Sequence, residues 1–319
     1  MKSTVMLPFI EPVTLSDRWL PEGPREVVVN GRAALAWVNI QTAADAISGS
    51  IHLRFWDNGE RRTLQQPGRP GFIIPTDRPN VILAGMGKQV GLIDLASNTW
   101  EPKTSIDDDN LRTTINDGEV SASGNVVVLG TKDLKFAEPI AKLYLLTVHG
   151  FHITELAEGH TCSNGKFFVS TKEETYLFDI DTPRRNIMKY HIDLESREII
   201  GEERAVDLSG IAGFPDGMID AGDGSAIVAI YNPAMVNEGR VIRVELHSGE
   251  IIEEWRVPGS PRVTCPLLIE QDGRVDLIVT TCDEGMPPEI RAQNPQVGAL
   301  LRGPTGLRSL PPQGLVMLS

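Results

Sequence analysis

The stretch PDGMIDAGDGSAIVAIY, residues 215–231, contains two turn signals close together. PDG at residues 215–217 has the composition of a tight turn, and DG at residues 223–224 is a strong β-hairpin signal. MID at residues 218–220 suffices for one short strand, and SAIVAIY then continues as a second strand. The stretch therefore predicts a hairpin that begins with an acidic turn, which a simple hairpin does not require.

The same order of turn and strands recurs along the chain. NDGEVSASGNVVVLG begins at Asn116, and SNGKFFVSTKEETYLFDID begins at Ser163. When Asn116, Asn164 and Asp216 are aligned, successive units are about 50 residues long, and one further unit begins near Thr264. Two earlier units contain GFIIPTDRPNVILAGM and EGPREVVVNGRAALAWV, which makes six units. Four-stranded propeller blades have about this length.

The composition agrees with an all-β chain. Strand-prone runs such as EVVVN, NVILAGM and AIVAIY recur between turn residues, and 30 glycines and 22 prolines provide many turns. A hydrophobic fraction of 41% is enough to form a large core. We therefore predict one domain, residues 1–319, that forms a six-bladed β-propeller with four-stranded antiparallel blades.

Charge and cysteine content exclude several classes of function. The net charge of −13 argues against nucleic acid or an anionic membrane as a partner. Three cysteines without a CxxC motif are a poor disulfide framework and suit a reducing compartment. The chain begins without a signal-peptide pattern, and no apolar run approaches the roughly 18 residues of a membrane span. We expect a soluble cytoplasmic protein and leave its oligomeric state open.

The repeat predicts where polar side chains meet. The first strand of a propeller blade lies innermost, so Glu22, Asn116, Asn164 and Asp216, which begin their units, should converge at one end of the channel. Two carboxylates and two amides would be left unsatisfied there without a partner. A divalent cation such as Ca²⁺, Mg²⁺ or Mn²⁺ suits oxygen ligands, and it could polarise a substrate carbonyl.

Several motifs occur in an order that resembles one known family. The sequence PEGP (21–24) is followed by NDG (116–118), SNG (163–165) and PDGMIDAGDG (215–224). This series is similar to the senescence-marker-protein (SMP-30)/gluconolactonase family, which includes luciferin-regenerating enzymes, and more distantly to phosphotriesterase-type propellers. The resemblance covers most of the chain. It implies a six-bladed propeller that binds a divalent metal ion and opens sugar lactones.

The resemblance also implies roles for individual residues. Glu22, Asn164 and Asp216 would be the ligands of one divalent cation, with Ca²⁺ the first choice and Zn²⁺, Mn²⁺ or Mg²⁺ as alternatives. Asp216 would in addition be the general base that activates the water attacking a lactone carbonyl. Asn116 would lie close to the ion and contact the small-molecule substrate.

One departure from the family leaves the substrate open. The family commonly has an arginine two residues before the asparagine of NDG, and this chain has Thr114 there, with Arg112 two residues further back. Thr114, Asn116 and Asp117 are the candidate substrate-binding residues, although Asp117 is expected to be a turn or structural hydrogen-bonding residue, with a substrate contact as the alternative. Two other functions stay open: hydrolysis of another ester or a phosphotriester at the same ion, and a non-catalytic calcium-binding or interaction propeller.

Three further features have both an ordinary and a functional interpretation. Cys162 is expected to be a buried core residue, because no histidine is spaced to activate it as a nucleophile. His160 is expected in a loop, with a place in the cavity as the alternative. The acidic residues 107–109 form either a solvated loop or a lid over the channel mouth.

Overall fold

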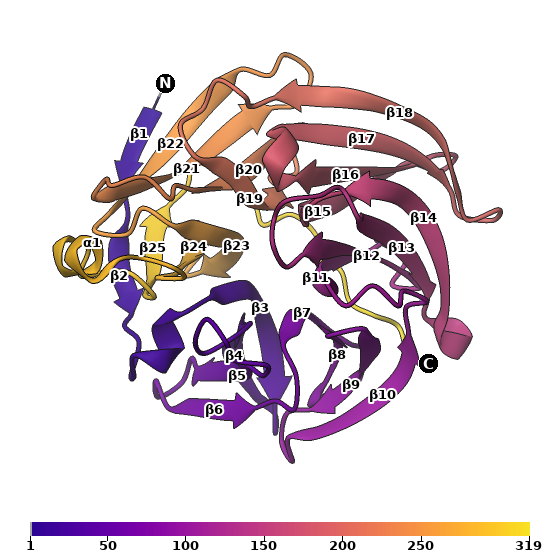
Figure 1. The fold of residues 1–319 in the computed structure, drawn as a ribbon, viewed down its shortest axis with the longest axis horizontal. Coiled ribbons are helices and arrows are strands. Elements are labelled where there is room, and N and C mark those ends of the chain that lie inside the picture. Colours follow the sequence, from indigo (N-terminus) through magenta and orange to yellow (C-terminus); the bar gives the residue numbers. More distant parts are fainter. Residues whose placement is uncertain (1) are drawn as a thin grey trace.

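A computed structural model of the chain describes residues 2–319. Six sheets stand side by side around a central channel, like the blades of a propeller (Figure 1). Strands within each blade run antiparallel, apart from one added edge strand, and each blade follows the previous one along the chain. The predicted all-β fold, a six-bladed propeller with four-stranded blades, is confirmed.

The first three blades occupy the first half of the chain. Blade 1 consists of β3 (Pro21–Val29), β4 (Arg32–Asn39), β5 (Ser50–Phe55) and β6 (Arg61–Gln65). Blade 2 consists of β7 (Pro70–Pro75), β8 (Val81–Met86), β9 (Gln89–Asp94) and β10 (Thr99–Ser105). Blade 3 consists of β11 (Thr113–Val120), β12 (Val126–Asp133), β13 (Ala141–Thr147) and β14 (His152–His160).

The last three blades continue this order, and both ends of the chain contribute to them. Blade 4 consists of β15 (Ser163–Ser170), β16 (Thr175–Asp181), β17 (Asn186–Asp193) and β18 (Glu198–Asp207). Blade 5 consists of β19 (Phe214–Asp220), β20 (Ser225–Tyr231), β21 (Glu238–Glu245), β22 (Ile251–Pro258) and the added strand β1 (Lys2–Val5). Blade 6 consists of β23 (Val263–Gln271), β24 (Arg274–Thr281), β25 (Leu300–Pro304) and β2 (Leu7–Ile10).

Helices are few. The described residues contain one α-helix, α1 (Pro288–Gln293), which lies between β24 and β25. Three short 3₁₀-helices are η1 (Ser16–Arg18), η2 (His149–Phe151) and η3 (Thr182–Arg184). No helix among residues 2–319 is long and apolar enough to cross a membrane.

The ring is closed by the N-terminal segment. β2 pairs antiparallel with β25 and forms the outermost strand of blade 6, while β1 pairs parallel with β22 at the edge of blade 5. On the inner side, the Thr264 hydroxyl donates a hydrogen bond of 2.7 Å to the carbonyl of Pro21, which joins blade 6 to blade 1. The C-terminal segment crosses behind the channel, where Val316 bridges to Thr76 (Figure 1).

The innermost strands share an irregularity near their first residues. β3, β7, β11, β15, β19 and β23 each pair with the next strand, and each pairing register shifts close to its start. Such bulges turn side chains away from the regular alternation and are common beside functional sites. The shifts lie at or beside Glu22, Asn116, Asn164 and Asp216. They therefore affect the direction in which these four side chains point.

The glycines of the repeated motifs serve close packing between inner strands. A Cβ atom on Gly217 would lie 2.7 Å from the Cα of Cys265 on β23. The tight turn predicted at residues 215–217 is therefore wrong, because these residues lie inside β19 and Gly217 is required by its neighbour strand. The hairpin turn predicted at residues 223–224 is confirmed between β19 and β20, where Gly224 has a φ of 85°.

The substitution Gly71→Ala tests this close packing. The added methyl group would lie 2.7 Å from the backbone oxygens of Ile115 and Asn116, which are held in β11 and cannot turn aside. We expect the free energy of unfolding to fall by about 3 kcal/mol. Urea unfolding measures it, and Gly210→Ala, with no atom within 4 Å of the new methyl group, should be nearly neutral. Equal stability of the two variants would contradict this account.

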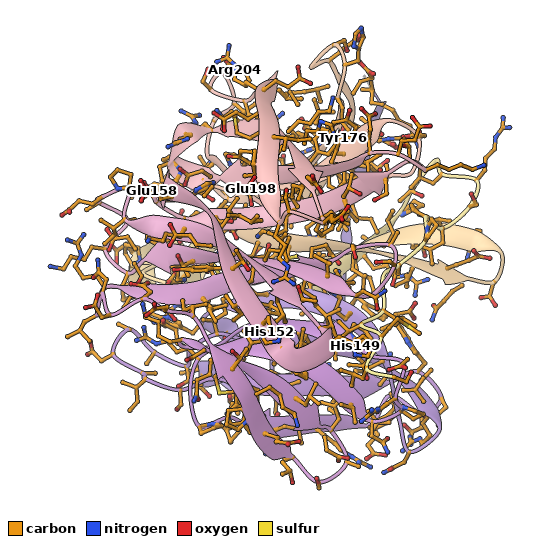
Figure 2. All side chains as sticks on the ribbon, turned by 90° about the vertical axis from the view of Figure 1, so that its right-hand side faces the viewer. His149, His152, Glu158, Tyr176, Glu198 and Arg204 are labelled. Carbon is orange, nitrogen blue, oxygen red and sulfur yellow. The ribbon has the colours of Figure 1, made fainter. Side chains whose placement is uncertain are left out.

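The outermost strands are polar. Figure 2 views the ring from the side of β14 and β18, where His152, Glu158, Glu198 and Arg204 are exposed. The second strand of each blade, in contrast, is mostly buried, as in β12 with all eight residues buried. The core thus lies between blades, and the polar groups at the channel mouth stand apart from it.

Candidate functional site

A cavity of about 490 Å³ opens at the end of the channel where the inner strands begin. It lies within the size range of small-molecule sites. Glu22, Asn116, Asn164 and Asp216 all contribute to its lining, each from a different blade. The structure therefore brings together the four residues that the repeat predicted would converge, although they span nearly 200 positions of the sequence.

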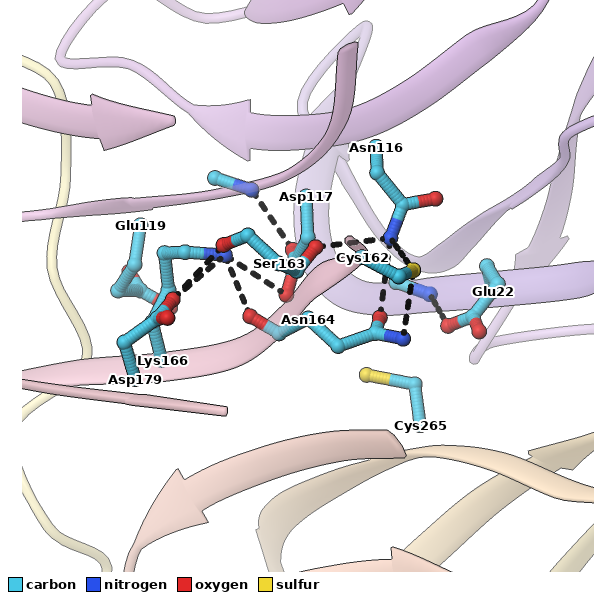
Figure 3. Close-up of polar contacts among 12 residues, drawn as sticks. Glu22, Asn116, Asp117, Glu119, Cys162, Ser163, Asn164, Lys166, Asp179 and Cys265 are labelled. Atoms are coloured by element: carbon cyan, nitrogen blue, oxygen red, sulfur yellow. Dashed lines mark hydrogen bonds and ion pairs between the residues drawn. The ribbon is translucent and has the colours of Figure 1, made fainter. Parts of the chain in front are cut away.

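Asn164 is oriented by a hydrogen-bond chain that crosses two blades. The Thr182 hydroxyl donates to the carbonyl of Pro215 at 3.0 Å, so its oxygen is left to accept the Asn164 amide nitrogen at 2.9 Å. The side-chain oxygen of Asn164 consequently points to the opposite side, toward Asn116 (Figure 3). Neighbours of this kind fix which atom a ligand residue presents to a metal ion.

Asn116 is anchored through its nitrogen. That nitrogen donates to the backbone oxygen of Ser163 at 3.0 Å and to the side-chain oxygen of Asn164 at 3.1 Å. The Cys162 sulfur lies 3.7 Å from it (Figure 3). The side-chain oxygen of Asn116 makes no hydrogen bond to any of residues 2–319 and is the part of this amide left for a ligand.

The carboxyl groups of Glu22 and Asp216 are poorly solvated. Burial raises the pKa of Glu22 well above its ordinary value, and the negative charges of Asp216 and Asp117 raise it further. Burial also raises the pKa of Asp216 well above its ordinary value, although the positive charge of Lys132 opposes the shift. Both ionised forms are therefore unfavourable without a cation nearby.

The donor set fits a hard divalent cation. Within the described chain, the backbone nitrogen of Gly23 at 3.2 Å is the one hydrogen-bond donor to Glu22, and Asp216 has none. Two carboxylates with spare lone pairs and one oriented amide oxygen match the oxygen ligands of Ca²⁺ or Mg²⁺. The set contains only two acids, and no group of three or more His, Cys, Asp or Glu side chains placed to hold a metal occurs in residues 2–319.

Lys132, Glu284 and Thr182 also line the cavity, and sequence reasoning missed all three. Lys132 is 7% exposed and has no carboxylate within ion-pair distance in the described part of the chain. It lies on β12 directly opposite Thr114 on β11. The position of Lys132 could have been predicted from the pairing of the NDG strand with the strand that follows it. A residue paired with the start of the NDG strand must lie near the same channel mouth.

The other two candidate substrate residues lie outside the cavity lining. The Thr114 hydroxyl donates a hydrogen bond of 3.2 Å to the carbonyl of Gly87, in the neighbouring blade. Asp117 lies 3.4 Å from the ammonium of Lys166 and accepts the backbone N–H of Gly118 at 2.7 Å. Their hydrogen bonds give both residues structural roles, and Asp117 acts on the site through its charge.

A buried ionic cluster supports the site from beneath. The Lys166 ammonium bonds to the backbone oxygen of Asn164 and lies 3.7 Å from Asp179 (Figure 3). Asp179 also accepts the Ser163 hydroxyl at 2.8 Å and lies 3.4 Å from His160. His160 is thus neither a loop residue nor a cavity residue but a buried one at the end of β14.

Cys162 is buried at 1% exposure, and its sulfur lies 3.6 Å from the Asn164 amide nitrogen. Burial raises the pKa of its thiol well above the ordinary value, which keeps the thiol neutral and unreactive. The expected core role therefore agrees with the structure. Cys162 also contributes to the cavity lining.

The acidic residues 107–109 lie in the loop before β11. Asp107 and Asp109 are exposed, whereas Asp108 forms an ion pair of 2.6 Å with Lys88. None of the three contributes to the cavity lining. These contacts agree with the interpretation as a solvated loop that is anchored at its centre.

Fold and site together define a six-bladed β-propeller with an acidic, amide-containing cavity at one channel mouth. The family model of the SMP-30/Gluconolactonase/LRE-like region matches residues 20–283. The chain belongs to this family, as the motifs predicted.

Individual proteins show the same relationship. A protein of unassigned function from Sulfolobus acidocaldarius is 28% identical over 243 residues, which cover 75% of this chain and 82% of that protein. The calcium-binding protein regucalcin from Agrobacterium tumefaciens has a similar structure, with a TM-score of 0.81, 20% identity and 99% of both chains covered. A gluconolactonase from Xanthomonas campestris is similar with a TM-score of 0.62, 12% identity and coverage of 95% and 96%. At these identities, the two structural matches establish the fold.

Proposed function

We propose that this protein is a divalent-cation-dependent hydrolase that opens a lactone. The observation that carries the proposal is the convergence of Glu22, Asn164 and Asp216, from three blades, in one cavity of a gluconolactonase-family propeller. The family relationship supports lactonase chemistry, and the resemblance to a calcium-binding propeller supports Ca²⁺ as the ion. The three unpaired cysteines support a place in the reducing cytoplasm.

Glu22, Asn164 and Asp216 would hold the ion through their side-chain oxygens. When bound, a divalent cation supplies positive charge that polarises a carbonyl group. The Asn164 amide nitrogen donates to the Thr182 hydroxyl, and the Asn164 oxygen accepts from Asn116. These two hydrogen bonds keep the Asn164 oxygen directed away from Thr182. The ligand set leaves space in the cavity for a lactone.

Asp216 acts as the general base in this proposal. Its carboxylate takes a proton from a water molecule as the water oxygen attacks the lactone carbonyl carbon. The ring C–O bond then breaks, and the ring oxygen leaves as a hydroxyl group after receiving the proton that Asp216 took from the water. The product is a hydroxy acid, whose carboxyl group ionises at neutral pH and releases one proton.

A pH-indicator assay tests the function. The full-length protein is supplied with Ca²⁺, Mn²⁺, Mg²⁺ or Zn²⁺ and a panel of lactones, and acid release is compared with the spontaneous rate. We expect at least one lactone to be opened faster, and the activity to disappear with excess chelator and to return with added metal. Spontaneous rates throughout the panel with every metal would refute the proposal.

Removing the cavity lysine should strengthen ion binding. The substitution Lys132→Met removes a positive charge that lies close to the carboxylates of Glu22 and Asp216. In the wild-type protein this charge interacts with both carboxylates and repels a divalent cation that binds to them. We expect the dissociation constant for Ca²⁺ to fall about tenfold. Isothermal titration calorimetry measures it, with the exposed Lys135→Met as the matched control. Weaker or unchanged Ca²⁺ binding in Lys132→Met would contradict this expectation.

A further inference from the structure

The wall of the cavity is apolar, in contrast to its floor. Leu20, Ile40, Leu134, Phe136, Phe214 and Tyr231 line the cavity, together with the buried Asn116, Asn164 and Asp216. Leu134 and Phe136 are 40% and 49% exposed, although both are large hydrophobic residues. Exposed apolar side chains gathered around a polar pocket are typical of a surface that binds an apolar group.

The exposed part of this wall is held in place. Asp133, which is fully buried, accepts the backbone N–H groups of Lys135, Ala137 and Glu138 at 3.0–3.1 Å, and it pairs with Arg112 at 2.6 Å. Phe136 has a φ of 51°, a left-handed conformation that is costly for a bulky residue and persists only when its surroundings impose it. The loop therefore presents an aromatic side chain at the mouth at a cost in backbone strain.

Few polar groups of the cavity are free to bind hydroxyl groups. The Thr182 hydroxyl and the Asn116 nitrogen are already engaged, and the Tyr231 hydroxyl donates to the backbone oxygen of Glu284 at 3.4 Å. The side chains of Lys132 and Glu284 and the Asn116 oxygen remain. A sugar lactone would lose the hydration of several hydroxyl groups here without equivalent partners, which is unfavourable.

Apolar residues also extend beyond the cavity on the same face. Loops that precede an inner strand, or that join the second and third strands of a blade, lie on the face where inner strands begin. They carry the exposed residues Val13, Leu15, Ile47, Leu111 and Met235. The surroundings of the mouth are thus suited to a ligand with a hydrophobic portion.

We propose that the substrate of this site is a lactone carrying an alkyl or aryl substituent, with the ring at the polar floor and the substituent against Phe136 and Phe214. This inference rests on the proposed lactonase function and specifies its substrate class. It differs from the expectation of a sugar lactone, whose several hydroxyl groups would find few free polar partners in this cavity.

Two six-membered lactones provide the test. The full-length protein with Ca²⁺ is assayed on δ-decalactone, which carries a pentyl chain, and on glucono-δ-lactone, with spontaneous hydrolysis subtracted. We expect kcat/KM to be at least about tenfold higher for δ-decalactone. In Phe136→Ser, KM for δ-decalactone should rise about tenfold, a larger increase than KM for glucono-δ-lactone shows. Ile200→Ser, an exposed apolar position on β18, is the control.

The outcomes separate the substrate class from the function. Higher kcat/KM for glucono-δ-lactone, or no effect of Phe136→Ser on δ-decalactone, would overturn the substrate class and leave the lactonase function standing. If neither lactone is opened, the function is in question, and calorimetric binding to the Asp216→Asn protein decides the inference. Tighter binding of δ-decalactone than of glucono-δ-lactone supports it, and the reverse order or equal binding overturns it.

Discussion

Replacing Asp216 by asparagine is expected to lower kcat for lactone opening about a thousandfold, because an amide cannot accept the proton of the attacking water. The folded structure should persist. The two side chains have nearly the same size, and the substitution removes a buried negative charge that no group in residues 2–319 hydrogen-bonds. Initial rates measured by pH-stat, together with the thermal unfolding midpoint, give both quantities.

A matched variant lies on the same strand. Asp220 is at the far end of β19, where it is partly exposed and accepts the backbone N–H of Gly222 at 2.8 Å. Asp220→Asn should retain wild-type kcat. If Asp216→Asn keeps more than a tenth of the wild-type kcat at saturating substrate and Ca²⁺, Asp216 is not the general base.

The second large effect concerns the ion itself. In Glu22→Gln one of the two carboxylates of the proposed ligand set becomes neutral, so the attraction of these ligands for a divalent cation is roughly halved. We expect Ca²⁺ affinity to fall roughly a hundredfold or more, since even residues that only support metal ligands change affinity by roughly 10–100-fold. Isothermal titration calorimetry at constant ionic strength measures this change without any substrate.

Glu26→Gln is the control for that experiment. Glu26 lies four positions further along β3 and lines a different cavity at the opposite end of the channel. Its substitution should leave Ca²⁺ affinity within about twofold. Equal affinities of the Glu22→Gln and Glu26→Gln proteins would remove Glu22 from the ligand set, and the proposed ion site with it.

The inner strands could be predicted from the sequence because each one needs two particular residue types at neighbouring positions near its start. The bulge turns a polar side chain toward the channel, and the glycine that follows allows the neighbouring strand to approach. Asn164-Gly165 and Asp216-Gly217 are therefore visible as two similar pairs, about one blade apart in the sequence. Their composition resembles a turn, which explains why residues 215–217 were predicted as one.

The outer strands and the ring closure could not be predicted in this way. β18 carries seven exposed residues out of ten, so it shows neither a hydrophobic run nor strict alternation. β2 belongs to a sheet whose other members begin more than 250 residues later, and pairing at that distance leaves no local pattern. Both cases reflect contacts formed only in the assembled ring.

In the site, the sequence revealed the groups on the inner strands but not those from second strands and loops. Lys132 occupies a strand interior, where a lysine normally points to solvent, and its burial follows from the position of β12 beside the channel mouth. Thr182 follows a strand end and became visible only through its bonds to Asn164 and Pro215. Thr114 was a candidate because it occupies the position of the family's substrate arginine, and in the structure its hydroxyl donates to the carbonyl of Gly87.

The way the ring closes has a consequence during synthesis. β2 is made among the first residues, yet the sheet it completes is finished only when Pro304 has left the ribosome. Until then residues 7–10 have no native partner, and blade 6 cannot seal the gap between blades 5 and 1. Assembly of the propeller, and with it the mouth of the channel, is therefore a late event in translation, whereas blades 1–5 can pair their own strands as they emerge.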